Sequence, residues 1–134
     1  MNVLILADLV TFSGVGNYIR YLTTSLVERG NKVVIATAQD DLHIEGVKTF
    51  LLRPINVNPI NILFNIRFLN SIIKEYSIDI IHANHRMSSF LVGVYNFFLS
   101  TYTNGMDISF WSISYEFYKE NNGILWRKEY RNIF

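Results

Sequence analysis

The sequence predicts an α/β fold, a three-layer sandwich in which helices cover a mainly parallel sheet. Short apolar runs without polar alternation, typical of strands buried on both faces, alternate with segments whose apolar residues recur at helical spacing. The connections are short, so successive strands should be joined by right-handed crossovers and lie parallel. With 134 residues, 50% of them hydrophobic, the chain is long enough to bury the core of one domain.

The strands are expected where the apolar runs occur. The first run reads VLILA and contains no polar residue, which favours a central strand covered on both faces. The expected strands cover residues 3–7, 32–38, 47–52 and 78–83.

The helices are expected between these runs. The first begins near Val15 and should end before Gly30, because glycine is a common C-terminal stop. Its inward stripe is Val15, Tyr18, Ile19, Leu22, Leu26 and Val27. The second starts at Asn58, which can cap free amides, followed by Pro59 at the first helical position. A last helix is expected at residues 87–99, and its inward residues are Phe90, Leu91, Val94 and Phe98.

The character of the chain changes after residue 99. The segment 100–134 is rich in Tyr, Phe and Trp and has poor periodicity. We therefore divide the chain into a domain at 1–99 and a divergent aromatic-rich segment at 100–134. One more strand at 108–113 and a short helix at 116–120 are expected in that segment.

Composition excludes several classes of protein. The formal net charge of +1 gives no field that would attract nucleic acid. The absence of cysteine removes disulfides and thiolate chemistry, and it fits a reducing, cytoplasmic compartment.

The apolar N-terminus carries Asp8 and lacks a basic leader, so it is interpreted as a strand and not as a signal peptide. The longest later apolar run, 90–99, is too short to span a bilayer. Peripheral contact with the inner face of the membrane stays open, because aromatic residues are plentiful.

A glycine-containing loop follows the first strand. It reads Ser13-Gly14-Val15-Gly16-Asn17 and leads into the first helix. Free backbone amides at such a helix start attract anions, and glycine lets a phosphate approach closely. The alternative is that the glycines only permit a tight turn, and the spacing alone leaves both interpretations open.

The loop does not match the common nucleotide fingerprints. A dinucleotide turn would place a third glycine at position 19, where Ile19 stands. It would also begin directly after the strand, whereas here a longer segment separates Ala7 from Gly14. Asp40 and Asp41 follow the second strand, as a ribose-binding acid would, but surface carboxylates explain them as well. A P-loop is excluded because no Gly-Lys-Ser/Thr follows.

Several motifs in this order resemble a known family. The segments MNVLILAD, FSGVGNYIRYL, ERGNKVVIAT and IDIIHANH are similar to the N-terminal domain of the retaining glycosyltransferases of family 4, which have the two-domain GT-B fold. The resemblance covers residues 1–99. It implies a Rossmann-like domain on the acceptor side of a cleft, with a nucleotide-sugar as donor substrate and neither a cofactor nor a metal.

The resemblance also implies roles for particular residues. The glycine loop of the family approaches the donor diphosphate, and the end of the fourth strand faces the acceptor. Carried over by position, the donor-phosphate residues are Gly14 and Gly16 with their neighbours Ser13 and Asn17, and the acceptor-cleft residues are His82 and His85. A metal at the histidines is disfavoured, since no carboxylate or cysteine adjoins them in sequence and three or four ligands are usual.

The chain also departs from the family pattern. The Glu-rich donor motif and the C-terminal domain are missing, and Asn104 stands about where the family has an active-site His. We therefore expect an incomplete, truncated transferase of glycan or lipid-linked acceptors, as in polysaccharide biosynthesis. It should be inactive unless a separate C-terminal subunit or a second copy completes it. The alternatives are a non-catalytic module that binds an acceptor or a partner, and, less favoured, a nucleotide-cofactor oxidoreductase domain.

Overall fold

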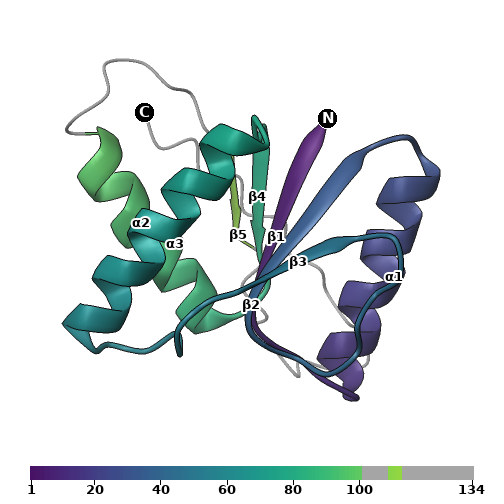
Figure 1. Ribbon diagram of the computed structural model, residues 1–134, viewed down its shortest axis with the longest axis horizontal. Coiled ribbons are helices and arrows are strands. Elements are labelled where there is room, and N and C mark those ends of the chain that lie inside the picture. The colour runs from purple at the N-terminus through teal and green to yellow at the C-terminus, as the bar shows by residue number, and fades with distance from the viewer. Residues whose placement is uncertain (101–108, 113–134) are drawn as a thin grey trace, which may run out of the picture.

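A computed structural model describes residues 1–100 and 109–112 as a five-stranded sheet in the order β3-β2-β1-β4-β5, in which every neighbouring pair is parallel (Figure 1). The α/β sandwich expected from the sequence is confirmed. The elements are β1 (Asn2–Val10), α1 (Gly14–Glu28), β2 (Lys32–Asp40), β3 (Lys48–Leu51), α2 (Pro59–Glu75), β4 (Ile80–Ala83), α3 (Arg86–Ser100) and β5 (Ser109–Ser112).

Strand β1 lies in the middle of the sheet. It pairs with β2 on one side and with β4 on the other, so that Val3 is opposite both Val33 and Ile80. Its residues 3–7 are buried on both faces, as the unbroken apolar run predicted. The strand is also tied at its start, because the backbone N–H of Asn2 donates to the carboxylate of Asp79 at 2.8 Å.

The helices cover the two faces of the sheet. Helix α1 lies on one face, and α2 and α3 lie together on the other (Figure 1). On the α1 face, Ile5 and Ile35 of the sheet pack with Ile19. On the opposite face the core contains Leu4, Leu6, Ile81, Leu69, Ile72 and Leu91. Helix α1 connects β1 to β2 in one direction across the sheet, whereas α2 and α3 connect β3 to β4 and β4 to β5 in the opposite direction. Right-handed crossovers in opposite directions place their helices on opposite faces.

The connection from β2 to β3 contains no helix. Residues 41–47 run back along the α1 face, and Leu42, Ile44 and Val47 pack against the core there. Two positive φ angles, 45° at His43 and 76° at Gly46, let this short return reverse direction. The return therefore substitutes for a crossover helix on that face.

Helix α2 is fixed to the chain before it by a buried amide. The side chain of Asn65, 2% exposed, accepts from the backbone N–H of Arg53 and donates to the Arg53 carbonyl, both at 3.0 Å. At the start of the helix, Asn58 accepts from the Ile60 amide at 2.9 Å, so the expected cap is confirmed.

Parts of the expected helix stripes are wrong. In α1, Ile19 is buried as expected, but Val15 and Val27 are exposed. In α3, Leu91 is buried as expected, whereas Phe90 and Phe98 face outward.

The rotation of α3 is set by its contact with α2. Leu91, Val92 and Tyr95 are the buried side chains of α3 in the core, and the Tyr95 hydroxyl donates to the side-chain oxygen of Asn70 on α2. Burial raises the pKa of Tyr95 to about 12, so this donor keeps its proton. A helix that is apolar around most of its circumference has no single stripe, and this packing selects one.

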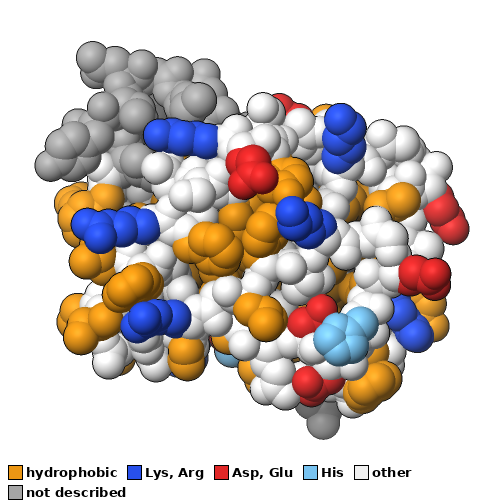
Figure 2. Space-filling view, viewed as in Figure 1, with side chains coloured by type: hydrophobic (Ala, Val, Ile, Leu, Met, Phe, Trp, Pro, Cys, Tyr) orange, Lys and Arg blue, Asp and Glu red, His pale blue; other side chains and the backbone are white. Residues whose placement is uncertain are grey.

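Two expectations fall outside the described residues, namely the helix at 116–120 and Asn104. Within residues 1–100 and 109–112, no helix combines the length and the apolar character needed to cross a membrane. Apolar side chains nevertheless gather over the α2 and α3 side of the surface (Figure 2), and the exposed ones there include Leu63, Phe64, Phe90 and Phe97.

Candidate functional site

A cavity of about 310 Å³ opens at the carboxyl ends of β1 and β4. Its lining consists of Ala7, Asp8, Leu9, Thr11, Ser13, Val15, Asn84 and His85. The chain leaves β1 toward β2 on one side and reaches β4 on the other, so the strand order reverses here. Ligands of parallel α/β sheets bind at such switch points, because the connections diverge and leave a crevice.

The start of α1 forms one wall of the cavity. Ser13 is the N-cap: its hydroxyl oxygen accepts from the Gly16 amide at 3.2 Å, and its carbonyl accepts from the Asn17 amide at 2.9 Å. Among the described residues, no partner is found for the amides of Gly14 and Val15. These amides are the donors that the helix start offers to an anion.

The structure explains the presence of glycine differently at the two positions of the loop. A Cβ on Gly16 would lie 1.8 Å from the Thr11 carbonyl oxygen and 2.8 Å from Leu42 Cδ1, so only glycine fits where α1 approaches the end of β1. A Cβ on Gly14 would meet nothing within 4 Å. Gly16 is therefore explained by packing, whereas the space around Gly14 is open.

A hydrogen-bonded cluster forms the opposite wall. The Asp8 carboxylate lies 2.5 Å from His85 Nδ1, and its other oxygen accepts from the hydroxyl of Ser88 in the first turn of α3. Ser88 is fully buried, and the side chains of Asp8 and His85 are 20% and 56% exposed. Sequence reasoning used Asp8 only as an argument against a leader peptide. A carboxylate that directly follows a buried apolar run was the available signal.

Asn84 supplies unsatisfied polar atoms. It is 3% exposed and lines the cavity, and its side-chain Nδ2 and Oδ1 both lack a hydrogen-bond partner among the described residues. Its backbone amide donates to the Leu6 carbonyl at 2.9 Å, which fixes the residue at the end of β1. Buried polar groups are rarely left unpaired, so these atoms are suited to a ligand. Asn84 stands in the IDIIHANH motif, but the sequence alone indicated no role for it.

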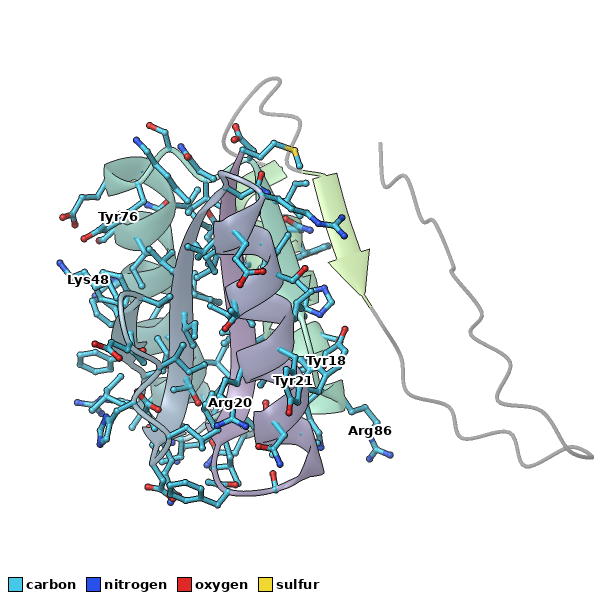
Figure 3. The ribbon with its side chains drawn as sticks, turned by 90° about the vertical axis from the view of Figure 1, so that its right-hand side faces the viewer. Tyr18, Arg20, Tyr21, Lys48, Tyr76 and Arg86 are labelled. Atoms are coloured by element: carbon cyan, nitrogen blue, oxygen red, sulfur yellow. The ribbon has the colours of Figure 1, made fainter. Side chains whose placement is uncertain are left out.

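The predicted residues are only partly brought together. Ser13 and His85 line the cavity, whereas Gly14, Gly16 and Asn17, in the first turn of α1, are not among its lining residues. His82 is not a lining residue. Its ring lies 6.5 Å from that of Tyr18, which projects from α1 (Figure 3), on the face that α1 covers.

Other candidates lie away from the cavity. His43 is exposed and 3.6 Å from Asp40, and Asp41 accepts from Gln39 at 2.7 Å, so these carboxylates serve the surface return after β2. Lys48 lies over the rings of Phe50 and Tyr76 at the β3 edge (Figure 3). No group of three metal-ligating side chains occurs within the part of the chain that the structure describes.

The fold and the cavity define a Rossmann-like domain with a cavity at its switch point. The chain belongs to Glycosyltransferase Family 4, whose model matches residues 12–127. Among curated proteins, none matches the chain by sequence.

Solved structures share the fold at low identity. A glycosyltransferase from Rickettsia africae is 22% identical with a TM-score of 0.58, over 83% of this chain and 29% of that one. MurG from Acinetobacter baumannii is 14% identical with a TM-score of 0.61, and the match covers 83% of this chain and 33% of MurG. Sucrose-phosphate synthase from Thermosynechococcus elongatus is 17% identical with a TM-score of 0.58, and the match covers 84% of this chain and 32% of the synthase. This chain thus spans about a third of their length, and the Rossmann-like fold is confirmed.

We expect Gly16→Ala to lower the free energy of unfolding by about 1–3 kcal/mol, because the methyl group would overlap the Thr11 carbonyl oxygen. Gly14→Ala is the matched control, with open space around it, and it should be neutral or stabilising by up to about 1 kcal/mol. Urea unfolding followed by circular dichroism measures both. Equal stability of the two variants would contradict the packing explanation.

We expect His82 to make the protein less stable in weak acid. Burial lowers the pKa of His82, so the unfolded chain binds a proton more readily than the folded one. Stability should fall as pH drops below about 6.5, by at most about 1.4 kcal/mol per pH unit, and level off below the folded pKa.

The check is urea unfolding between about pH 8 and pH 5, the range that brackets imidazole titration. His82→Gln should reduce the acid-induced loss, whereas His43→Gln, at an exposed site, should retain it. An unchanged loss in His82→Gln would show that other groups cause it.

Proposed function

We propose that this chain is the acceptor-side, N-terminal domain of a retaining glycosyltransferase. The complete enzyme transfers a sugar from a nucleotide-diphosphate sugar to a glycan or lipid-linked acceptor. The observation that carries the proposal is the cavity at the switch point, bordered by the helix start and by unpaired polar groups, in a chain of this family. Residues 1–99 are proposed as the domain, with 100–134 as a separate segment.

The proposed donor-phosphate site is the start of α1. The unpaired amides of Gly14 and Val15 and the positive end of the helix dipole favour an anion there. Gly16 contributes by keeping α1 close to β1, since its own amide is used by Ser13. Asn17, whose side chain is exposed, adds a polar group beside the loop.

This arrangement suits breakage of the donor bond. Negative charge grows on the diphosphate as the sugar departs, and backbone amides already aimed at it stabilise that charge without reorganisation. No metal or cofactor is required by the proposal. The acceptor occupies the cavity between Ser13 and His85, next to the phosphate.

A second candidate is a non-catalytic module that binds an acceptor or a partner. The observation that favours it is the exposed apolar surface over α2 and α3, because such patches mark contacts with other molecules (Figure 2). Both candidates include a ligand in the cavity, and they differ in whether sugar transfer follows.

The donor-phosphate site is tested by removing one amide proton. Gly14→Pro deletes the N–H at the first helical position, where proline fits, and the extended Ser13 before it (φ −141°) is compatible with proline. Gly14→Ala keeps the N–H. A charge-assisted hydrogen bond contributes about 1.5–3 kcal/mol, so Gly14→Pro should weaken binding of inorganic pyrophosphate or UDP-glucose by about tenfold or more.

Binding is measured by calorimetry and by amide shifts of Gly14 and Val15 in NMR spectra. Gly14→Ala should bind as wild type does. Equal affinity of the proline and alanine variants would refute anion binding at this amide. Saturable binding of NAD without binding of UDP-glucose would instead favour the oxidoreductase alternative.

Sugar transfer is expected to need more than residues 1–134. The solved relatives in fold are about three times as long, and in the proposed enzyme the donor nucleotide is held largely by another domain. The pure chain, assayed for release of UDP from UDP-glucose with glycan acceptors, should therefore show no turnover above background. Robust transfer by this chain alone would overturn the proposal that it acts as one half of a catalytic unit.

A further inference from the structure

The charge of the cavity wall is unusual for a site next to a phosphate. Among the described residues, the lining contains the carboxylate of Asp8 and no Lys or Arg. An anion inside the cavity would face that carboxylate, and repulsion at short range is costly where water is partly excluded. The lining favours an uncharged ligand.

We propose that Asp8 is a positioning residue that holds His85 in the tautomer protonated at Nδ1, so that Nε2 accepts a hydrogen bond from an uncharged hydroxyl group in the cavity. This inference rests on the proposed function and identifies the bound group as an acceptor hydroxyl. It assigns the phosphate to the start of α1, on the wall of the cavity that this helix forms.

The tautomer follows from the hydrogen bonds of Asp8. An ionised carboxylate only accepts, so His85 Nδ1 at 2.5 Å must carry the proton between them. The second carboxylate oxygen accepts from Ser88, whose full burial prevents water from replacing Asp8 as its partner. Both oxygens are therefore engaged, and the ring of His85 is fixed at one nitrogen.

The remaining ring nitrogen is available to a ligand. Nε2 lies on the other side of the imidazole from Nδ1, and no partner for it is found among the described residues. The His85 side chain is 56% exposed and lines the cavity. A neutral imidazole protonated at Nδ1 offers Nε2 as an acceptor only.

Asn84 complements this acceptor. Its unpaired Nδ2 and Oδ1 can donate to and accept from the same ligand. A hydroxyl group both donates and accepts, whereas an ionised phosphate oxygen only accepts. The pair His85 and Asn84 therefore matches a polyol better than an anion.

The first test is the tautomer in the full 134-residue chain. Long-range ¹H–¹⁵N NMR spectra at about pH 9, where an ordinary imidazole is neutral, distinguish a protonated from an unprotonated ring nitrogen. We expect His85 to be protonated at Nδ1 and bare at Nε2. A proton found on Nε2 of wild-type His85 overturns the inference, whatever the variants do.

The second test is Asp8→Asn. The amide can donate to Nδ1 and still accept from Ser88, so His85 should switch to the Nε2-protonated tautomer while the fold is kept. Asp40→Asn is the matched control beside the exposed His43, and it should leave the His85 signals unchanged. Retention of the Nδ1-protonated form in Asp8→Asn would count against Asp8 as its cause. If that variant fails to fold, the tautomer of His85 in the wild-type chain decides whether the inference stands.

The third test separates the two ligands. Glycerol and methyl α-glucopyranoside, at high millimolar concentrations, should shift the His85 Nε2 signal, and pyrophosphate should shift the Gly14 and Val15 amides instead. A His85 response to pyrophosphate and not to the hydroxyl probes overturns this inference and leaves the phosphate site standing. A normal His85 response without any shift at Gly14 and Val15 overturns the phosphate site alone. No response of Nε2 to either hydroxyl probe also overturns the inference.

Discussion

The position of β1 between β2 and β4 is the constraint from which the rest of the domain follows. A strand with parallel neighbours on both sides, and with helices on both faces, can carry only apolar side chains along its length, as residues 3–7 do. Polar chemistry is then confined to its end. Asp8 is the first polar residue there, and Asn84 directly follows β4 at the same edge. The candidate site therefore lies where the run of buried residues 3–7 in β1 ends.

The close approach of α1 to the end of β1 is the second constraint, and it separates two roles within one short motif. Gly16 lets the helix touch the Thr11 carbonyl, and Ser13 caps the turn by occupying the Gly16 amide. The amides left over belong to Gly14 and Val15. A motif with two glycines thus contains one residue needed for packing and one position open to a ligand, although spacing alone makes them look equivalent.

The sequence predicted the sheet because unbroken apolar runs and helical periodicity are local signals. Of the residues that it proposed for a site, Ser13 and His85 line the cavity. Alternation along β4 explains why His82 does not, since Ile81 and Ala83 face α2 and α3 and the side chain between them must face α1. The partnership of Asp8 with Ser88 joins residues far apart in the chain, so no local pattern reveals it. The outward-facing aromatics of α3 were mispredicted because tertiary packing alone sets its rotation.

The direction of the Asp8 carboxylate reconciles an acidic residue with the phosphate site proposed at the start of α1. Both would be attracted to the positive end of α1, and they cannot share it. The hydrogen bonds from His85 and Ser88 draw the carboxylate to the start of α3, on the other face of the sheet, where a second helix dipole favours it. The amides of Gly14 and Val15 stay unpaired among the described residues, as the proposed anion site requires. In the proposed site, two helix starts, one on each face, therefore hold the carboxylate and the phosphate apart, and the cavity is left for an uncharged group.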